Sequence, residues 1–218
     1  MAPAIARTTQ LLLSALIFLS AEALALSMDV GMLTQVQGAV TLAGEKESGK
    51  AVSAFTKVRA GDKLALSQGA RLQLVYFDGG RQETWQGSGQ LEVGTSESKS
   101  ATLKPEVKQL PAILVKQLVK SPSPDVKNRA GMIMMRAIAT PQDIKAFEDN
   151  YTAMRKETDP ADFTPELYLL SGLFEHKEYQ RIKEVLADLN AQHPDNPDVK
   201  AMVEHYGRVT DIATSKQK

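Results

Sequence analysis

Apolar residues alternate with polar ones through the first half of the chain, from about residue 28 to residue 103. In the run Arg71–Phe77, the side chains of Leu72, Leu74 and Tyr76 fall on one face of an extended strand. The same alternation recurs in shorter runs, with apolar positions at Val36, Val40 and Leu42, at Leu64 and Leu66, and at Leu91 and Val93. No helix-length segment separates these runs, so they predict an all-β roll or sandwich.

Turn residues and polar segments mark the limits of this β region. Asp78-Gly79 lies between two strand-like runs and predicts a β-hairpin, because both residues tolerate a positive φ. We expect a last strand at Ala101–Leu103, and then a linker over residues 105–127 with a short helix near Pro111–Val119. Within the linker, Ser121-Pro122-Ser123-Pro124 predicts a stiff boundary between partly independent halves.

The second half of the chain has the period of a helix. One apolar stripe consists of Ile144, Phe147, Tyr151 and Met154. Thr140-Pro141 and Thr164-Pro165 each combine a capping residue with a first-turn proline, which signals a helix start. Further stripes lie within residues 179–189 and 199–206, and short turns between short helices predict antiparallel hairpins.

These patterns predict a segregated α+β fold. An all-β domain over residues 26–104 precedes helical hairpins over residues 128–218. We therefore expect two binding-type architectures joined by a linker, rather than a parallel sheet with its ligand crevice.

The first 25 residues differ from the rest of the chain. Arg7 precedes an apolar run over residues 11–19, and Ala23-Leu24-Ala25 fits the small-residue pattern of a signal-peptidase site. The run is short for a membrane span. These features predict a Sec-type signal peptide with cleavage after Ala25, and a periplasmic or secreted protein without membrane association. An uncleaved signal-anchor helix is the alternative.

Composition excludes several functions. The 218 residues include 26 Lys and Arg against 26 Asp and Glu. This balance argues against nucleic-acid binding, which needs clustered positive charge. The chain has no Cys, which excludes disulfides, thiol catalysis, thiolate metal sites and a lipid-modified amino-terminal cysteine. No G-x-S-x-G or G-x-G-x-x-G motif occurs, so we expect neither an enzyme nor a bound cofactor.

Three short blocks of the β region occur in a characteristic order. They are VQGAVTL at Val36–Leu42, VRAGDKL at Val58–Leu64 and GARLQLVYFDG at Gly69–Gly79. Together they resemble the FecR-like periplasmic domain, whose order is V-x-G-x-V, then G-D-x-L, then a strand ending in D-G. FecR proteins relay signals from outer-membrane ferric-siderophore receptors to a sigma factor, so the resemblance implies a periplasmic binding module.

The helical half resembles the tetratricopeptide repeat. The matching apolar and proline positions are Leu169, Tyr179, Leu186 and Pro194. Pro160 and Pro194 are 34 residues apart, which is the length of that repeat. Generic helical hairpins are the alternative, and either arrangement implies a surface for partners rather than a reaction centre.

One candidate interaction face lies on the predicted hairpin. Its residues are Arg71, Gln73, Arg81, Glu83 and Trp85. Trp85, the only tryptophan, suits either a binding hot spot or the β core, where its large apolar area is buried. For the polar residues, the alternative is a solvated face.

Candidate metal ligands are few. His176, His193 and His205 lack the spacing of a metal site, and we expect exposed or capping roles for them. The methionine cluster within Met132–Met135 contains soft thioether ligands for Cu(I), but flexible methionines also fill gaps between helices, and we favour core packing. We therefore predict no metal site.

The sequence predicts an exported, non-enzymatic binding or scaffold protein of the bacterial envelope. Its FecR-like domain and its helical surface would engage an envelope protein. The alternative is a membrane-tethered sensor subunit of an envelope signalling system. A third class, an accessory of a carbohydrate or murein hydrolase, would need convergent carboxylates.

Overall fold

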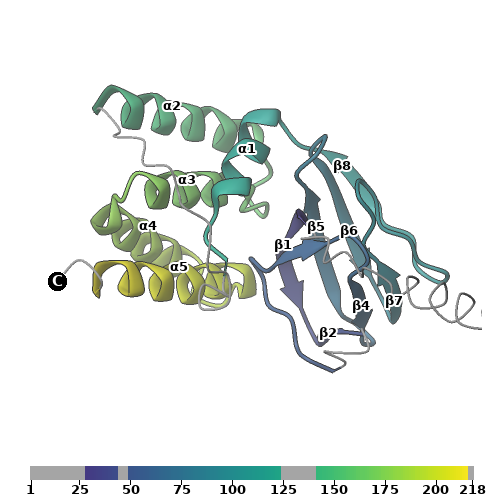
Figure 1. Ribbon diagram of the computed structural model, residues 1–218. Helices are drawn as coiled ribbons and strands as arrows, with labels where there is room; N and C mark the ends of the chain where they lie inside the picture. The colour runs from purple at the N-terminus through teal and green to yellow at the C-terminus, as the bar shows by residue number, and fades with distance from the viewer. Residues whose placement is uncertain (1–27, 44–48, 124–140, 216–218) are drawn as a thin grey trace, which may run out of the picture.

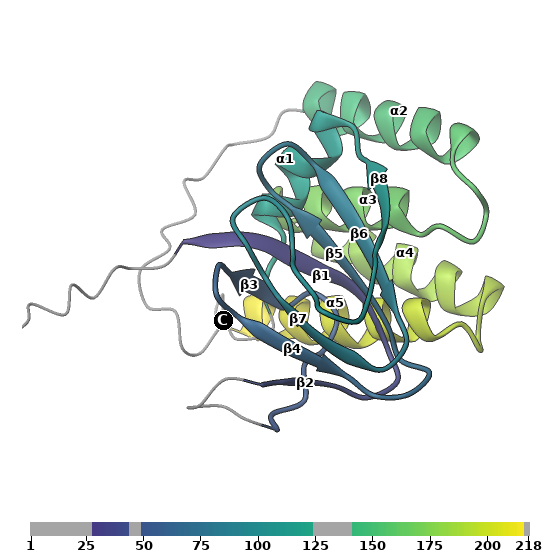
Figure 2. The same cartoon turned by 90° about the vertical axis from the view of Figure 1, so that its right-hand side faces the viewer.

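A computed structural model describes residues 28–43, 49–123 and 141–215 of the chain. In these residues, two antiparallel sheets over residues 29–109 precede five packed helices, which confirms the segregated α+β prediction. The helices cover one face of the larger sheet and the smaller sheet lies on its other side (Figure 1, Figure 2). The predicted signal peptide and the methionine cluster lie outside the described residues.

Eight strands form the two sheets. The five-stranded sheet has the order β3-β1-β5-β6-β8, with β3 Lys57–Arg59, β1 Asp29–Gln37, β5 Arg71–Tyr76, β6 Arg81–Gln86 and β8 Glu106–Gln109. The three-stranded sheet has the order β2-β4-β7, with β2 Val40–Leu42, β4 Lys63–Leu66 and β7 Gly89–Glu92. All the pairings are antiparallel.

The first core lies between the two sheets. Leu72, Leu74 and Tyr76 of β5 are fully buried there, as their alternation predicts. Leu64 and Leu91 reach the same core from the smaller sheet. Trp85 joins them from β6, opposite Leu72.

The β5–β6 hairpin forms at the predicted site. Its turn covers residues 77–80, and both Gly79 and Gly80 have φ near 70°. A Cβ added to Gly80 would lie 2.8 Å from Val115 Cγ2, so the hairpin turn sits tightly against the first helix.

The last strand is not where the sequence predicts it. Residues 101–103 are not a strand, because the Ser100 hydroxyl accepts hydrogen bonds from the backbone N–H groups of Thr102 and Leu103 and bends the chain. The last strand is instead β8, which pairs with β6 at the sheet edge. The β region therefore extends beyond residue 104.

Five helices follow the sheets, and α2 to α5 are stacked side by side in Figure 1 while α1 contacts α3. Their bounds are α1 Ala112–Lys120, α2 Pro141–Glu157, α3 Thr164–Glu175, α4 Tyr179–Gln192 and α5 Pro197–Ser215. Helices α2 and α3 begin at the predicted start signals, although the N-cap residue of α3 is Phe163 and Thr164 lies within the helix. Within the described residues, none of these helices is both long and apolar enough to cross a membrane.

A second core joins the helices to the larger sheet. Met32, Phe55 and Val75 from the β region pack in one cluster with Leu118 and Leu170 from the helices. Because a single apolar cluster spans both halves, they share a buried joint.

The Ser-Pro segment after α1 belongs to this joint. The Ser121 side chain is buried and its hydroxyl contacts that of Ser171, which also contacts the Tyr206 hydroxyl at 2.7 Å. His205 donates its Nε2–H to the Pro122 carbonyl at 3.0 Å and stacks on Phe55. These buried contacts hold residues 121–122 against the helices α3 and α5.

The three histidines divide between two roles. His176 and His193 are the C-cap residues of α3 and α4, as expected for capping histidines. His205 contradicts the expectation, since it is buried in the joint. Burial lowers the pKa of His205 from 6.5 to about 4, so its ring is neutral at physiological pH.

Candidate functional site

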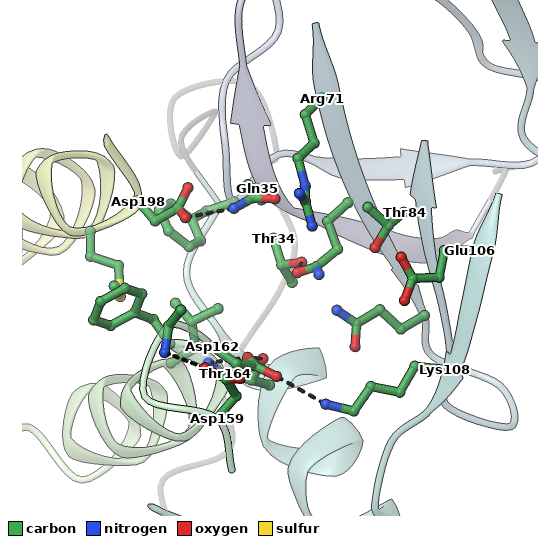
Figure 3. Close-up of a pocket in the computed structure, with 17 residues that line it drawn as sticks. Thr34, Gln35, Arg71, Thr84, Glu106, Lys108, Asp159, Asp162, Thr164 and Asp198 are labelled. Carbon is green, nitrogen blue, oxygen red and sulfur yellow. Dashed lines mark hydrogen bonds and ion pairs between the residues drawn. The ribbon is translucent and has the colours of Figure 1, made fainter. Parts of the chain in front are cut away.

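A polar cavity of about 350 Å³ lies between the larger sheet and the helices (Figure 3). Its sheet wall carries Thr34, Gln35, Arg71, Gln73, Gln82, Thr84, Glu106 and Lys108. Its helix wall carries Asp159, Asp162, Thr164 and Asp198. The apolar part of the lining consists of Phe55, Phe163, Leu167 and Met202, with Ala161 beside it. The cavity lining thus combines many polar groups with a few apolar side chains.

Strand alternation explains the polar sheet wall. The register places Gln73 opposite Thr84 and Val75 opposite Gln82, so these residues share the face that looks toward the helices. The neighbouring residues Leu72 and Leu74 fill the core on the other face. One strand therefore supplies both an apolar core face and a polar cavity face.

Three polar atoms of the wall are buried and have no hydrogen-bond partner in the described part of the chain. They are Arg71 Nε, Gln82 Oε1 and Gln35 Oε1. Gln82 is only 3% exposed. Figure 3 shows the Arg71 guanidinium pointing into the cavity from the sheet. Buried polar groups are nearly always paired in folded proteins. Three unpaired atoms in side chains that line one cavity therefore need a specific explanation.

The charge of Arg71 has no ion-pair partner among the described residues. The cavity's other cation, Lys108, is paired with Asp162 across a distance of 2.9 Å. Arg71 therefore offers N–H donors to any molecule that enters the cavity.

The helix wall is held in place by hydrogen bonds. Asp162 accepts from Lys108 Nζ and from the backbone N–H of Thr164 at 3.0 Å, at the start of α3. Burial raises the pKa of Asp162, but the hydrogen bonds from Thr164 and Lys108 outweigh it and lower the pKa below 3.8. Asp162 is thus ionised at neutral pH.

Asp198 is held at the start of α5. Its carboxylate accepts hydrogen bonds from Gln35 Nε2 at 2.5 Å and from Gln37 Nε2 at 3.3 Å. The backbone N–H groups of Asp198 and Val199 are capped by Asn196 Oδ1. Strand β1 and helix α5 therefore meet at a fixed geometry on one side of the cavity.

The five residues of the predicted interaction face are split between two faces of the sheet. Arg71 and Gln73 line the cavity. Arg81, Glu83 and Trp85 share the opposite face, because Leu72 pairs with Trp85 and Leu74 with Glu83. The prediction of one common face is wrong, and Trp85 occupies the core position that was its alternative.

Glu83 shows why the predicted face is not a surface. It is fully buried, and its carboxylate accepts from Arg81 Nε at 2.8 Å, from Trp85 Nε1 at 3.1 Å and from the Ser98 backbone N–H at 3.2 Å. All of these partners belong to the protein itself. The group is a structural cluster under the loop that carries Ser98.

A second hollow, of about 470 Å³, lies between α2, α3 and α4. Its buried acid, Glu166, accepts from Arg155 Nη1 at 2.9 Å and from the Tyr151 hydroxyl at 3.1 Å. Burial raises the pKa of Tyr151 to about 12, with the Glu166 charge as the next cause. This acid is satisfied within the protein, so the hollow is a weaker candidate than the cavity.

Sequence reasoning missed most of the cavity. Gln35, Gln82 and Asp198 lie far apart in the sequence, and each resembles an ordinary surface residue. Only the strand register and the packing of α5 against β1 bring them together. Within the described ranges, no cluster of three His, Cys, Asp or Glu is placed to hold a metal ion.

No model of a known protein family, no curated protein and no solved structure matches the chain. The resemblance to the FecR-like domain therefore stays a prediction that rests on three sequence blocks.

Proposed function

We propose that the protein is a non-enzymatic binding protein of the bacterial envelope, and that the cavity between the sheet and the helices is its ligand site. One observation carries this proposal. The Arg71 guanidinium points from β5 into the cavity, and no carboxylate of the described residues forms an ion pair with it.

The unpartnered side chains of the cavity wall lower the stability of the protein. Leaving a buried donor or acceptor without a partner costs about 1–3 kcal/mol. An apolar residue such as Leu at position 82 would avoid that cost, yet the sequence has Gln there. An acceptor group of a ligand would pair with the Arg71 guanidinium in the cavity, which favours a binding role.

The lining supports binding rather than catalysis. The residues that form the cavity include no His, Cys or Ser. Asp162 and Asp198 already accept hydrogen bonds from Lys108 and from Gln35. A general base needs a free acceptor with a pKa near the working pH, and the lowered pKa of Asp162 does not fit that role.

The envelope setting comes from the sequence. The amino-terminal segment predicts export, and the FecR-like blocks imply a periplasmic module. We further propose that an envelope protein is the partner of the helical half. Crosslinking in intact cells, with mass spectrometry of partners and of the amino terminus, tests both points. A chain beginning at Leu26 supports export with cleavage, whereas an intact amino terminus supports the tethered sensor.

Native mass spectrometry tests the ligand site. We expect wild-type protein incubated with a small-molecule extract of bacterial cells to carry a non-covalent adduct. The adduct should be lost in Gln82→Leu and kept in Gln86→Leu, a matched change at an exposed position of the same strand. An absence of any adduct on the wild-type protein would overturn the proposal.

A further inference from the structure

We infer that the ligand of the cavity is a short zwitterionic peptide, with its carboxylate at Arg71 and its ammonium group at Glu106. The inference rests on the proposed function and adds the chemical class of the ligand and its orientation. Two side chains of opposite charge that face the same cavity carry it, together with the polar groups between them on the sheet.

Arg71 provides the positive end of the site. Its Nε is buried, but Nη1 and Nη2 are not, and Figure 3 shows the guanidinium pointing into the cavity. Within the described residues, no carboxylate forms an ion pair with it. A guanidinium presents its N–H groups in a fork that matches the two oxygens of a carboxylate, so a ligand carboxylate would supply the missing partner.

Glu106 provides the negative end. It is exposed on β8, and Figure 3 shows its carboxylate pointing into the same cavity. In the described part of the chain, neither Lys nor Arg forms an ion pair with Glu106. Lys108, two residues along the strand, is paired with Asp162 at 2.9 Å instead. A ligand ammonium group would bring the opposite charge that Glu106 lacks.

Two neutral side chains lie between these charges on the same face of the sheet. Gln73 is two residues from Arg71 along β5 and lies opposite Thr84 of β6. Thr84 in turn lies opposite Glu106 of β8. The Gln73 amide N–H₂ is free to donate, because its Oε1 accepts from the Thr34 hydroxyl at 2.8 Å. A peptide bond has one C=O acceptor and one N–H donor, which match an amide N–H₂ and a hydroxyl oxygen.

The spacing of the two charges matches the length of a dipeptide. Strand β6 separates β5 from β8, so the Cα atoms of Arg71 and Glu106 lie about 12 Å apart, at two strand spacings and one two-residue step. An extended dipeptide is about 7 Å long. A charge-assisted hydrogen bond at each end adds about 2.8 Å. The cavity volume of about 350 Å³ also suits a ligand of this small size.

Ligands with charges of only one sign fit this wall less well. A dicarboxylate would place an anion beside Glu106, and a diamine would place a cation beside Arg71, so each would bring like charges together. Leu167 of α3 and Met202 of α5 also line the cavity, which suits a peptide with an apolar side chain.

Isothermal titration calorimetry on the full chain tests the inference. The probes are alanyl-alanine, leucyl-alanine and alanyl-leucine, each also in its N-acetylated and its C-amidated form. We expect at least one free dipeptide to bind saturably, and its two blocked forms to bind at least tenfold more weakly.

Substitutions of the two charged side chains test where the dipeptide binds. Arg71→Gln and Glu106→Gln should each weaken binding of the free dipeptide at least tenfold. The matched controls are Arg208→Gln and Glu92→Gln, at exposed positions outside the cavity lining, and they should change binding less than twofold. Circular dichroism and thermal melting confirm that each variant is folded.

The blocked dipeptides assign the two ends of the ligand. Because Glu106 meets the ammonium group, Glu106→Gln should reduce the preference for the free over the N-acetylated form at least fivefold. The preference for the free over the amidated form should stay within twofold. Arg71→Gln should have the reverse effect, whereas a merely structural change would weaken all forms alike and overturn the assignment.

The remaining outcomes separate the inference from the proposed function. Dipeptide binding that Arg71→Gln leaves unchanged overturns the inference, because the peptide then binds elsewhere. Equal affinity for free and blocked forms overturns it as well, because the charged ends are then not recognised. Failure of every dipeptide also overturns the inference. If the wild-type protein still carries an adduct in native mass spectrometry, the proposed function stands, and if it carries none, both fail.

Discussion

The buried polar side chains on the two faces of strand β6 differ in whether the protein supplies their hydrogen-bond partners. On the face toward the small sheet, the Glu83 carboxylate is fully buried and receives hydrogen bonds from Arg81, Trp85 and Ser98. On the face toward the helices, the neighbouring Gln82 is almost as deeply buried, but its carbonyl oxygen has no partner. Buried polarity by itself therefore does not mark a functional site. The informative feature is whether the protein supplies the partners.

We expect the largest loss of stability on the face of β6 where the buried carboxylate of Glu83 has hydrogen-bond partners. Glu83→Ala removes a buried charge and leaves three donors without an acceptor, so we expect the free energy of unfolding to fall by about 4 kcal/mol. Urea denaturation measures this loss. Glu97→Ala is the matched control, since Glu97 also faces Arg81 but is 60% exposed, and it should change stability by less than about 0.5 kcal/mol. Equal losses in the two variants would contradict the comparison.

His205 is an intermediate case, because Nε2 has a partner and Nδ1 has none. Burial lowers its folded-state pKa to about 4, while the unfolded chain binds a proton near pH 6.5. The unfolded state therefore binds more protons between these values, and stability should fall by about 3 kcal/mol as pH drops from 6.5 to 4.

Denaturation at a series of pH values measures this dependence. His205→Gln keeps an N–H donor for Pro122 and does not titrate in this range, so it should remove most of this acid-dependent loss. If the free energy of unfolding of His205→Gln still falls as steeply between pH 6.5 and 4, other groups cause the loss of stability.

At the joint between the two halves, the hydroxyls of Ser171 and Tyr206 are a further case of buried polar groups whose partners the protein supplies. Ser171→Ala leaves the fully buried Tyr206 hydroxyl without its partner at 2.7 Å. We expect a loss of about 2 kcal/mol, which corresponds to a fall of several degrees in melting temperature. Ser215→Ala, at an exposed position near the end of α5, is the control and should have little effect. A loss of similar size in the control would contradict the assignment.

We expect the smallest change in stability on the other face of β6, where Gln82 Oε1 has no hydrogen-bond partner. Gln82→Leu removes an unpartnered acceptor, so the stability of the ligand-free protein should stay unchanged or rise by up to about 1 kcal/mol. Thermal melting against Gln86→Leu measures the difference. A clear loss of stability would mean that Gln82 has a structural partner, and the contrast between the two faces would fail.

Local signals in the sequence predict much of the fold. The alternation around Leu72 and Leu74 and the turn at Asp78-Gly79 give the central hairpin. The prolines at positions 141 and 165 mark two helix starts. Strand β8 escapes prediction because all four of its side chains are exposed at a sheet edge and show no alternation.

The cavity depends on tertiary packing, which local patterns do not encode. Gln82 and Thr84 have the spacing of an exposed strand face, and helices cover that face only in the folded chain. Arg71 and Gln73 are part of the predicted site, but the sequence groups them with Glu83 and Trp85 because it does not reveal which residues of β6 lie opposite β5 positions.

The contact between Gln35 and Asp198 joins positions 163 residues apart, from the first strand to the last helix. Contacts of such long sequence separation form late and slow the folding of a domain. The cavity therefore has no counterpart in a nascent chain, and under the proposed function a ligand would bind only after synthesis and folding are complete. An exported chain that folds only after translocation would thus acquire its ligand at its destination rather than carry it from the cytoplasm.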